Sequence, residues 1–279
     1  MTAKKKATAS LHVLLAPEAP VGIVLRSGPA ESVCAFLWDR GKDTFTAGQV
    51  LKGRLHGRRS DLSPDGKYLL YFAASKSPVA GTGGSWTAVS RAPWLKPLVL
   101  LGKGDAWHGG GLFTGKHSYW VNEGFGHRAI RNSPEVVRDM AYVPFEYYGG
   151  EDPRIYYLRL QRDGWELKRY AVVGEWHGCS IFEKPLPRGW VLRKLAHEEM
   201  EPLPGKGRYW EEHELEQESP ARRVGCPDWE WADVDGPSVV WAEKGCLYRA
   251  RISGPAGLGG IKRLKDFNSA KPAAGKPPY

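Results

Sequence analysis

The clearest pattern along the chain is a unit of two short apolar strands joined by a tight turn. Apolar residues occur in runs of strand length, separated by glycine, proline and aspartate. The strongest copy is Asp61–Phe72, in which Ser63-Pro64-Asp65-Gly66 forms the turn and Tyr68-Leu69-Leu70-Tyr71 begins the second strand. Proline presets φ for a turn, aspartate bonds its own backbone, and glycine supplies a positive φ. The pattern therefore predicts β-strands rather than helices.

The strand–turn–strand unit recurs along the chain. The five copies are Leu11–Leu25 around Gly22, Asp61–Phe72 around Gly66, Gly111–Asn122 around Gly115, Ile181–Leu195 around Gly189, and Trp231–Ala242 around Gly236. The glycines are separated by 44, 49, 74 and 47 residues, and three of these spacings match a four-stranded propeller blade. We place the extra residues of the long spacing in an insertion at about 124–152.

Further strands fill out each unit. They are Ser32–Trp38, Thr44–Leu51, Ser85–Arg91, Pro97–Leu101, Ile155–Gln161, Trp165–Tyr170, Arg208–Glu216, Cys246–Ser253 and Ile261–Phe267. The only helix that we predict is Pro134–Tyr142, with Ser133 as its N-cap and Pro134 at its first position.

These elements predict an all-β chain, a five-bladed β-propeller of four-stranded antiparallel blades with one loop or helix insertion. Six blades, or a double sandwich, are the alternatives. The propeller is expected to be a single domain over 10–267, flanked by a basic tail at 1–9 and a Pro/Ala/Gly/Lys tail at 268–279.

The turn motif also resembles a known signature. Leu62-Ser63-Pro64-Asp65-Gly66-Lys67, followed by apolar residues, is similar to the blade motif of the TolB-like, PD40 branch of β-propellers. The Val234-Asp235-Gly236 copy lacks the Ser-Pro pair, and Leu186-Pro187-Arg188-Gly189 departs further. The resemblance implies a propeller fold but no particular activity, because its relatives act in protein–protein binding or as gating domains beside hydrolases.

Charge and composition narrow the function classes. The formal net charge is +9, but five lysines lie in the two tails: Lys4, Lys5, Lys6, Lys271 and Lys276. Without them, the net charge of the remaining chain is +4 (9 − 5). We therefore favour a mixed, solvated surface, and keep nucleic-acid or other anionic-ligand binding as an alternative. Met1–Leu15 looks superficially like a signal peptide, but its apolar run is short and contains His12, so we interpret it as a tail and first strand.

No run of 18 apolar residues is present, so no membrane-spanning helix is expected. Four cysteines in so long a chain predict reduced thiols and a cytoplasmic protein rather than a disulfide framework: Cys34, Cys179, Cys226 and Cys246.

Loops before the inner strands carry the residues most suited to chemistry. A His-Gly pair occurs at three equivalent places, and a cysteine takes the fourth: the metal candidates are His56, His108, His177 and Cys226. Zinc suits these ligands, but we expect no cofactor, because we favour histidines that cap strand ends beside flexible glycine turns, with a metal-free ligand pocket as the next alternative.

The same loops predict a binding face. Arginine binds carboxylate or phosphate groups through paired hydrogen bonds, and aromatic rings stack on flat ligand groups such as nucleic-acid bases. The candidate binding residues are Arg58, Arg59, Asp61, Trp107, His108, Tyr148, His177 and Trp229. The alternative is that Arg59 and Asp61 pair across blades to hold the ring together.

Catalytic motifs are weak. Gly-x-Ser-x-Gly, His-Glu-x-x-His and a phosphate-cradling loop are absent, and Glu211-Glu212-His213-Glu214 is expected to be a solvated strand. A five-bladed glycoside hydrolase is the main enzyme alternative, with acids drawn from Asp61, Glu123, Glu183 and Asp233. We predict a non-enzymatic module that binds a protein partner through the mouth loops and the 124–152 insertion.

Overall fold

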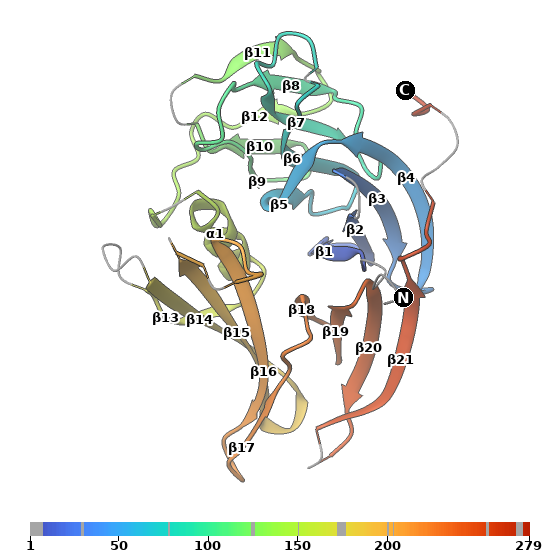
Figure 1. Cartoon of the computed structure of the whole chain (residues 1–279), viewed down its shortest axis with the longest axis vertical. Helices are drawn as coiled ribbons and strands as arrows, with labels where there is room; N and C mark the ends of the chain where they lie inside the picture. The colour runs from blue at the N-terminus through green and yellow to red at the C-terminus, as the bar shows by residue number, and fades with distance from the viewer. Residues whose placement is uncertain are drawn as a thin grey trace, which may run out of the picture. The chain divides into compact units, whose positions relative to one another are not determined.

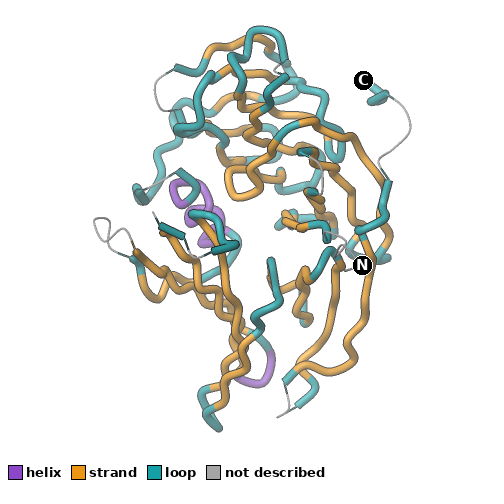
Figure 2. Tube along the Cα trace, in the orientation of Figure 1, coloured by secondary structure: helices purple, strands orange, loops and turns teal. Residues whose placement is uncertain are grey.

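The computed structural model describes residues 8–28, 31–77, 79–123, 126–149, 151–171, 177–199, 201–202, 204–254, 257–271 and 276–279. In these residues, twenty-one strands form five sheets, joined by one α-helix and one short 3-10 turn (Figures 1 and 2). The predicted all-β class is confirmed. The chain divides into two compact units, unit 1 (Met1–Arg159 with Ala270–Tyr279) and unit 2 (Leu160–Ser269), which we describe separately.

Unit 1 contains three sheets. Sheet A has the order β1 (Ser10–Leu15), β2 (Val21–Ser27), β3 (Ser32–Asp39), β4 (Thr44–Lys52). Sheet B has the order β11 (Arg128–Arg131), β8 (Val99–Gly102), β7 (Ser85–Arg91), β6 (Tyr68–Ala74), β5 (Arg54–Leu62). Sheet C has the order β12 (Val137–Arg138), β10 (Ser118–Val121), β9 (Gly111–Phe113). All pairs are antiparallel except β10–β12.

Two apolar cores join the sheets of unit 1 face to face. The first lies between sheets A and B and includes Ile23, Ala35, Leu69 and Tyr71. The second lies between sheets B and C and is formed by Leu70, Val89, Phe113, Tyr119 and their neighbours. Because β6 is buried on both faces, its side chains alternate between the two cores, which explains its unbroken apolar run.

Unit 2 contains two antiparallel sheets. Sheet D has the order β13 (Glu166–Arg169), β14 (His177–Pro185), β15 (Trp190–Glu199), β16 (Tyr209–Gln217), β17 (Arg222–Gly225). Sheet E has the order β18 (Trp231–Asp235), β19 (Ser238–Glu243), β20 (Cys246–Ile252), β21 (Leu258–Asp266). The 3-10 turn Pro187–Gly189 connects β14 to β15.

Each predicted strand–turn–strand copy forms an antiparallel pair. Gly66 and Gly236 adopt positive φ angles of 76° and 57°, as the turns require. The first turn differs from the prediction, because Gly22 lies inside β2 instead. A Cβ at Gly22 would lie 3.2 Å from the Trp38 ring, so glycine there makes room for tryptophan rather than for a turn.

The predicted helix Pro134–Tyr142 is wrong. Val137–Arg138 is strand β12, and the backbone N–H groups of Val137 and Asp139 donate to His117 and Tyr119 carbonyls at 2.7 Å. Pairing with the open edge of β10 therefore outweighs the local helix-start signal of Ser133-Pro134.

In the described residues, the α-helix is α1 (Pro153–Arg162), where Ile155–Gln161 was predicted to be a strand. Proline at its first position starts the helix after Asp152. At its end, the Gly164 and Trp165 N–H groups donate to Gln161 and Leu160 carbonyls at 3.1 and 2.9 Å, which is a Schellman cap. The apolar residues of α1 are buried on every side, so they show no helical periodicity. Among the described residues, no helix has the length and apolar character needed to cross a bilayer.

Candidate functional site

Arg59, predicted to bind a ligand, is instead enclosed by partners from its own unit. Its side chain is only 1% exposed. Nε donates to Asp152 Oδ1 at 2.7 Å, Nη2 donates to Glu151 Oε2, and Nη1 donates to the Ala106 and His108 carbonyls at 2.7 and 2.9 Å. The guanidinium also lies over the Phe72 ring. This arginine therefore ties strand β5 to the start of α1 and to the loop before β9.

A second arginine, Arg159 of α1, completes this buried cluster. Its Nη1 donates to the Gly57 carbonyl at 3.0 Å and to the Ser60 carbonyl, and Nη2 lies 3.1 Å from His12 Nε2. Arg58 and Arg159 place their guanidinium carbons 5.4 and 5.1 Å from the centroid of the Tyr156 ring. The predicted residue Arg58 thus stabilises the helix by a cation–π contact.

The predicted pairing of Arg59 with Asp61 is not what the described contacts show. Asp61 is buried and accepts a hydrogen bond of 2.7 Å from the Phe113 N–H of β9. The other carboxylates considered for sugar cleavage each hold a cation of their own: Glu123 contacts Arg138, Glu183 contacts Arg193, and Asp233 contacts Lys184. Each of these three carboxylates is therefore part of an ion pair.

The histidine candidates for a metal lie in different surroundings. Burial, reinforced by the charge of Arg59, lowers the pKa of His56 to about 4. The centroids of the His56 and Phe72 rings are 5.3 Å apart. Burial and the nearby charge of Arg154 also lower the pKa of His108. The side chain of His177 lies outside the described residues. Within the described part of the chain, no three His, Cys, Asp or Glu side chains are grouped so that they could hold a metal ion.

Trp107 remains a candidate for binding because it is 63% exposed. The loop that carries it is fixed from below, since the Trp107 N–H donates to Asp105 Oδ1 at 2.9 Å. Asp105 is itself held by the buried ammonium group of Lys103 at 2.7 Å. The indole is therefore displayed by an ordered loop.

The most distinctive surface of unit 1 is the segment Val137–Tyr147, which we call the apolar loop. Five of its side chains are between 58% and 74% exposed: Val137, Met140, Val143, Phe145 and Tyr147. Large apolar side chains are normally scattered singly over a soluble protein. Their concentration in one short segment marks it as a candidate interaction surface.

Internal contacts hold the apolar loop in place. The Asp139 carboxylate accepts hydrogen bonds from the Ala141 and Tyr142 N–H groups at 3.1 and 3.0 Å, an Asx turn. Tyr142 packs on Trp120, with ring centroids 5.6 Å apart. The loop is thus anchored through its polar and inward-facing residues while its apolar side chains face outward.

The predicted residue Tyr148 is the anchor at the far end of the apolar loop. It is 5% exposed, and its ring meets that of Tyr157 edge to face, with centroids 5.3 Å apart. Beside it, the Arg154 guanidinium lies 5.2 Å from the Tyr147 ring centroid. Tyr148 is therefore structural, and its neighbour Tyr147 is 58% exposed.

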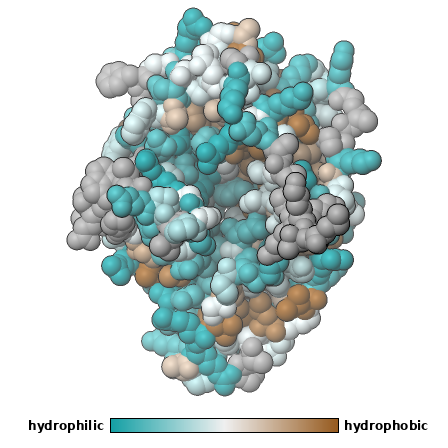
Figure 3. All heavy atoms as spheres, in the orientation of Figure 1, coloured by the Kyte–Doolittle hydropathy of each residue, from teal (hydrophilic) through white to brown (hydrophobic). Residues whose placement is uncertain are grey.

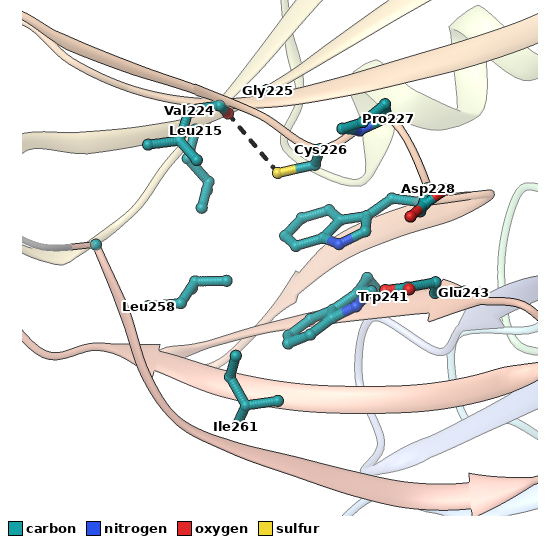
Figure 4. Close-up of a pocket in the computed structure, with 12 residues that line it drawn as sticks. Leu215, Val224, Gly225, Cys226, Pro227, Asp228, Trp241, Glu243, Leu258 and Ile261 are labelled. Carbon is teal, nitrogen blue, oxygen red and sulfur yellow. Dashed lines mark hydrogen bonds between the residues drawn. The ribbon is translucent and has the colours of Figure 1, made fainter.

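Unit 2 has a pocket of about 370 Å³ between β17 and the strands of sheet E (Figure 4). Leu215 and Val224 lie on one side of it, and Leu258 and Ile261 on the other (Figure 4). Figure 3 shows apolar side chains on the visible surface of this part of unit 2. Two predicted residues, Cys226 and Trp229, line the pocket.

Trp229 is a wall of this pocket rather than an exposed stacking platform. It is 8% exposed, and its ring stacks on Trp241 with centroids 4.7 Å apart and an interplanar angle of 16°. Cys226 Sγ lies 3.7 Å from the Val224 carbonyl oxygen. Burial and the charges of Glu214 and Glu243 raise the pKa of the Cys226 thiol to about 12.

A buried polar cluster in unit 2 was missed by the sequence interpretation. Lys194 Nζ lies 2.9 Å from Glu211 Oε2, 3.0 Å from His213 Nε2 and 5.1 Å from the Trp165 ring centroid. Lys194, Glu211 and His213 are each 3% exposed or less. The expectation that residues 211–214 form a solvated strand is wrong for Glu211 and His213, because alternate residues of β16 face sheet E.

Strand alternation is the signal that points to this cluster. Glu211 and His213 are two residues apart and share one face with Leu215. By contrast, Asp152 and Glu151 carried no local sign of their role, because their partner Arg59 is more than ninety residues away.

Among sequence comparisons, no protein-family model matches the chain and no curated protein shows a significant match to it.

Proposed function

We propose that the five sheets are the blades of a five-bladed, TolB-like β-propeller. Apart from β11 of sheet B, which follows β9 and β10 of sheet C, the sheets follow one another in chain order. Sheet A packs on B, and B on C, through apolar cores. In unit 2, sheets D and E meet through the Lys194 ammonium and the Ala232 carbonyl at 3.3 Å. Successive sheets that pack face to face are the repeating feature of propellers.

We infer that the protein is a non-enzymatic module that binds another protein through the apolar loop. The observation that carries this proposal is the set of outward-facing apolar side chains on an anchored segment. Aromatic residues, methionine and arginine are enriched at protein interfaces, and hot spots favour tryptophan, tyrosine and arginine. Phe145, Met140, Tyr147 with Arg154, and the exposed Trp107 supply these residue types.

An ordered loop suits binding for a second reason. Association costs free energy when loops and side chains must be immobilised at the interface. The Asx turn at Asp139 and the packing of Tyr142 and Tyr148 remove part of that cost, because the backbone is already held.

We place the protein in the cytoplasm. All four cysteines are free: Cys34, Cys179, Cys226 and Cys246. Free thiols that are never paired are typical of reducing compartments.

The test is to make the loop polar without touching its anchors. The triple variant Met140→Ser, Phe145→Ser, Tyr147→Ser should capture a partner identified with the natural sequence much more weakly. With that partner purified, we expect the dissociation constant to rise at least about thirtyfold, the effect of one strong hot spot. Isothermal titration calorimetry measures this change.

The matched control is Ile261→Ser, because Ile261 is equally exposed but belongs to unit 2. Binding by this control should equal that of the natural sequence, and all variants should unfold at the same temperature. If the loop variant and the control bind the partner with the same affinity, the apolar loop is not the interface.

A further inference from the structure

Tyr279 occupies a defined place on unit 1. The chain leaves unit 1 after Arg159, builds unit 2, and returns to unit 1 with Ala270–Tyr279. Within that returning segment, residues 270–271 and 276–279 are described, and Tyr279 contacts the end of β7 and the connection from β7 to β8. Its partners are Arg91, the last residue of β7, and Lys96 of the connection.

The phenol hydroxyl of Tyr279 uses both of its hydrogen-bonding functions. It accepts a hydrogen bond from the Arg91 N–H at 3.1 Å and donates one to the Lys96 carbonyl at 2.8 Å. A phenylalanine makes neither bond, and a phosphorylated tyrosine has no hydroxyl hydrogen left for the carbonyl. The geometry therefore selects an unmodified tyrosine.

Two cations contact the ring of Tyr279. The Arg91 guanidinium carbon is 4.8 Å from the ring centroid, and Lys96 Nζ is 5.1 Å from it. Lys96 Nζ also donates to the main-chain oxygen of Tyr279. Cation–π contacts of this kind add to the hydroxyl bonds without competing for the same atoms.

The guanidinium of Arg91 is held in position by Glu135. Arg91 Nε and Nη2 donate to the two Glu135 oxygens at 2.9 and 2.8 Å, and Glu135 Oε2 lies 3.3 Å from the Tyr68 hydroxyl. A bidentate pair fixes the plane of the guanidinium. One half of the socket is therefore organised by residues that do not touch Tyr279.

We propose that Arg91 and Lys96 form a recognition socket for an unmodified tyrosine that follows a proline-rich stretch, and that its occupant in this protein is the chain's own Lys276-Pro277-Pro278-Tyr279. Prolines pre-order the segment and lower the entropy lost on docking. Because segment and socket belong to one chain, the effective concentration is high and a weak contact suffices for occupancy. A peptide of the same chemistry from another molecule would compete for the socket.

The first test measures how well Lys96 is shielded. The purified full chain is treated briefly with an acetylating reagent, and the acetylation of each lysine is followed by mass spectrometry. We expect Lys96 to react at least about threefold faster in Tyr279→Ala than in the natural sequence, because the segment loses the hydroxyl hydrogen bonds and the cation–π contacts that hold it against Lys96. Lys42, whose side chain is 78% exposed, is the internal control and should react equally in both.

The second test supplies the segment in trans. A fluorescein-labelled peptide with the sequence of residues 270–279 is titrated with the Tyr279→Ala protein, and fluorescence anisotropy reports binding. We expect saturable binding that is weaker to the natural sequence, whose socket is already filled. Replacing the peptide's tyrosine by phenylalanine should weaken binding about fivefold, and phosphotyrosine should weaken it further.

Two results would overturn the proposal. One is a Lys96 acetylation rate that is the same in the natural sequence and in Tyr279→Ala. The other is tighter binding of the phosphotyrosine peptide than of the unmodified peptide. That result would mean that Arg91 and Lys96 act as a simple anion site.

Discussion

The Arg59 guanidinium on β5 donates to the carboxylate of Asp152, the residue before α1, with Nε and Oδ1 2.7 Å apart. The Arg59 side chain is 1% exposed and that of Asp152 is 14% exposed. This contact joins two segments separated by 93 positions, and Glu151 adds a second carboxylate to the same guanidinium. The start of the only helix in the described residues is thereby attached to sheet B.

Replacing Arg59 with methionine should therefore be strongly destabilising. Glu151 and Asp152 would keep their charges in a largely buried site without their cation, and breaking a buried pair costs about 3–5 kcal/mol. Urea unfolding measures the loss of free energy. The control is Lys76→Met, which removes an exposed pair with Glu31 and should cost less than about 1 kcal/mol. Similar losses in the two variants would show that the Arg59 cluster contributes no special stability.

Gly110 is expected to tolerate no side chain. Its φ is +79°, and a Cβ would lie 2.1 Å from the Arg59 carbonyl oxygen. Gly110→Ala should therefore lower the melting temperature substantially, since it adds a backbone clash to the strain of a positive φ. Gly104→Ala is the matched control, because Gly104 has a φ of +85° but no atom within 4 Å of the added Cβ. Equal melting temperatures for the two variants would contradict this explanation.

The protein should lose stability as the pH falls from about 6.5 to 4. Burial lowers the pKa of His56 from 6.5 to about 4, so the unfolded chain binds a proton at a pH where the folded chain does not. The stability that this difference supplies is complete above pH 6.5, is lost as the pH approaches 4, and totals about 3 kcal/mol for His56. Burial also lowers the pKa of His127 to about 4, which adds to the same slope.

Urea titrations at several pH values check this linkage. His56→Gln removes the titrating group, so its unfolding free energy should depend less steeply on pH between 7 and 4 than that of the natural sequence. His117→Gln alters an exposed imidazole and serves as the control. An unchanged slope in His56→Gln would show that His56 is not buried as a neutral side chain.

Lys194 and Glu211 should behave as one unit in the interior of unit 2. Lys194→Met alone leaves the Glu211 carboxylate buried and should cost about 3–5 kcal/mol. Adding Glu211→Gln removes that charge, so the double variant should recover at least about 1 kcal/mol in urea unfolding. Lys168→Met, at an exposed pair with Glu166, is the control for loss of a lysine. A double variant less stable than Lys194→Met would argue against coupling.

The hairpins were predictable from the sequence because their information is local. At Asp61–Phe72, the turn residues and the following apolar run lie within a dozen positions, and β5 and β6 pair there as expected. The same holds for the copies that end at Asn122 and Ala242. Of the two tryptophans predicted to bind, Trp107 is 63% exposed and Trp229 is buried.

The helix was misplaced because two segments carry the same local start signal. Ser133-Pro134 and Asp152-Pro153 are alike in sequence, but the first is followed by residues that pair with β10 and the second by residues buried on all sides. Only the tertiary structure distinguishes an open strand edge from an enclosed apolar site.

The roles of the site residues were also decided by distant contacts. The sequence by itself identified Arg59 and the histidine–glycine turns as unusual, but not the carboxylates that neutralise Arg59 or the burial that lowers the pKa of His56. Turn type and strand alternation depend on neighbours along the chain. Charge pairing, burial and the display of the apolar loop depend on which segments meet after folding, and that is settled by the summed packing of the whole sheet arrangement.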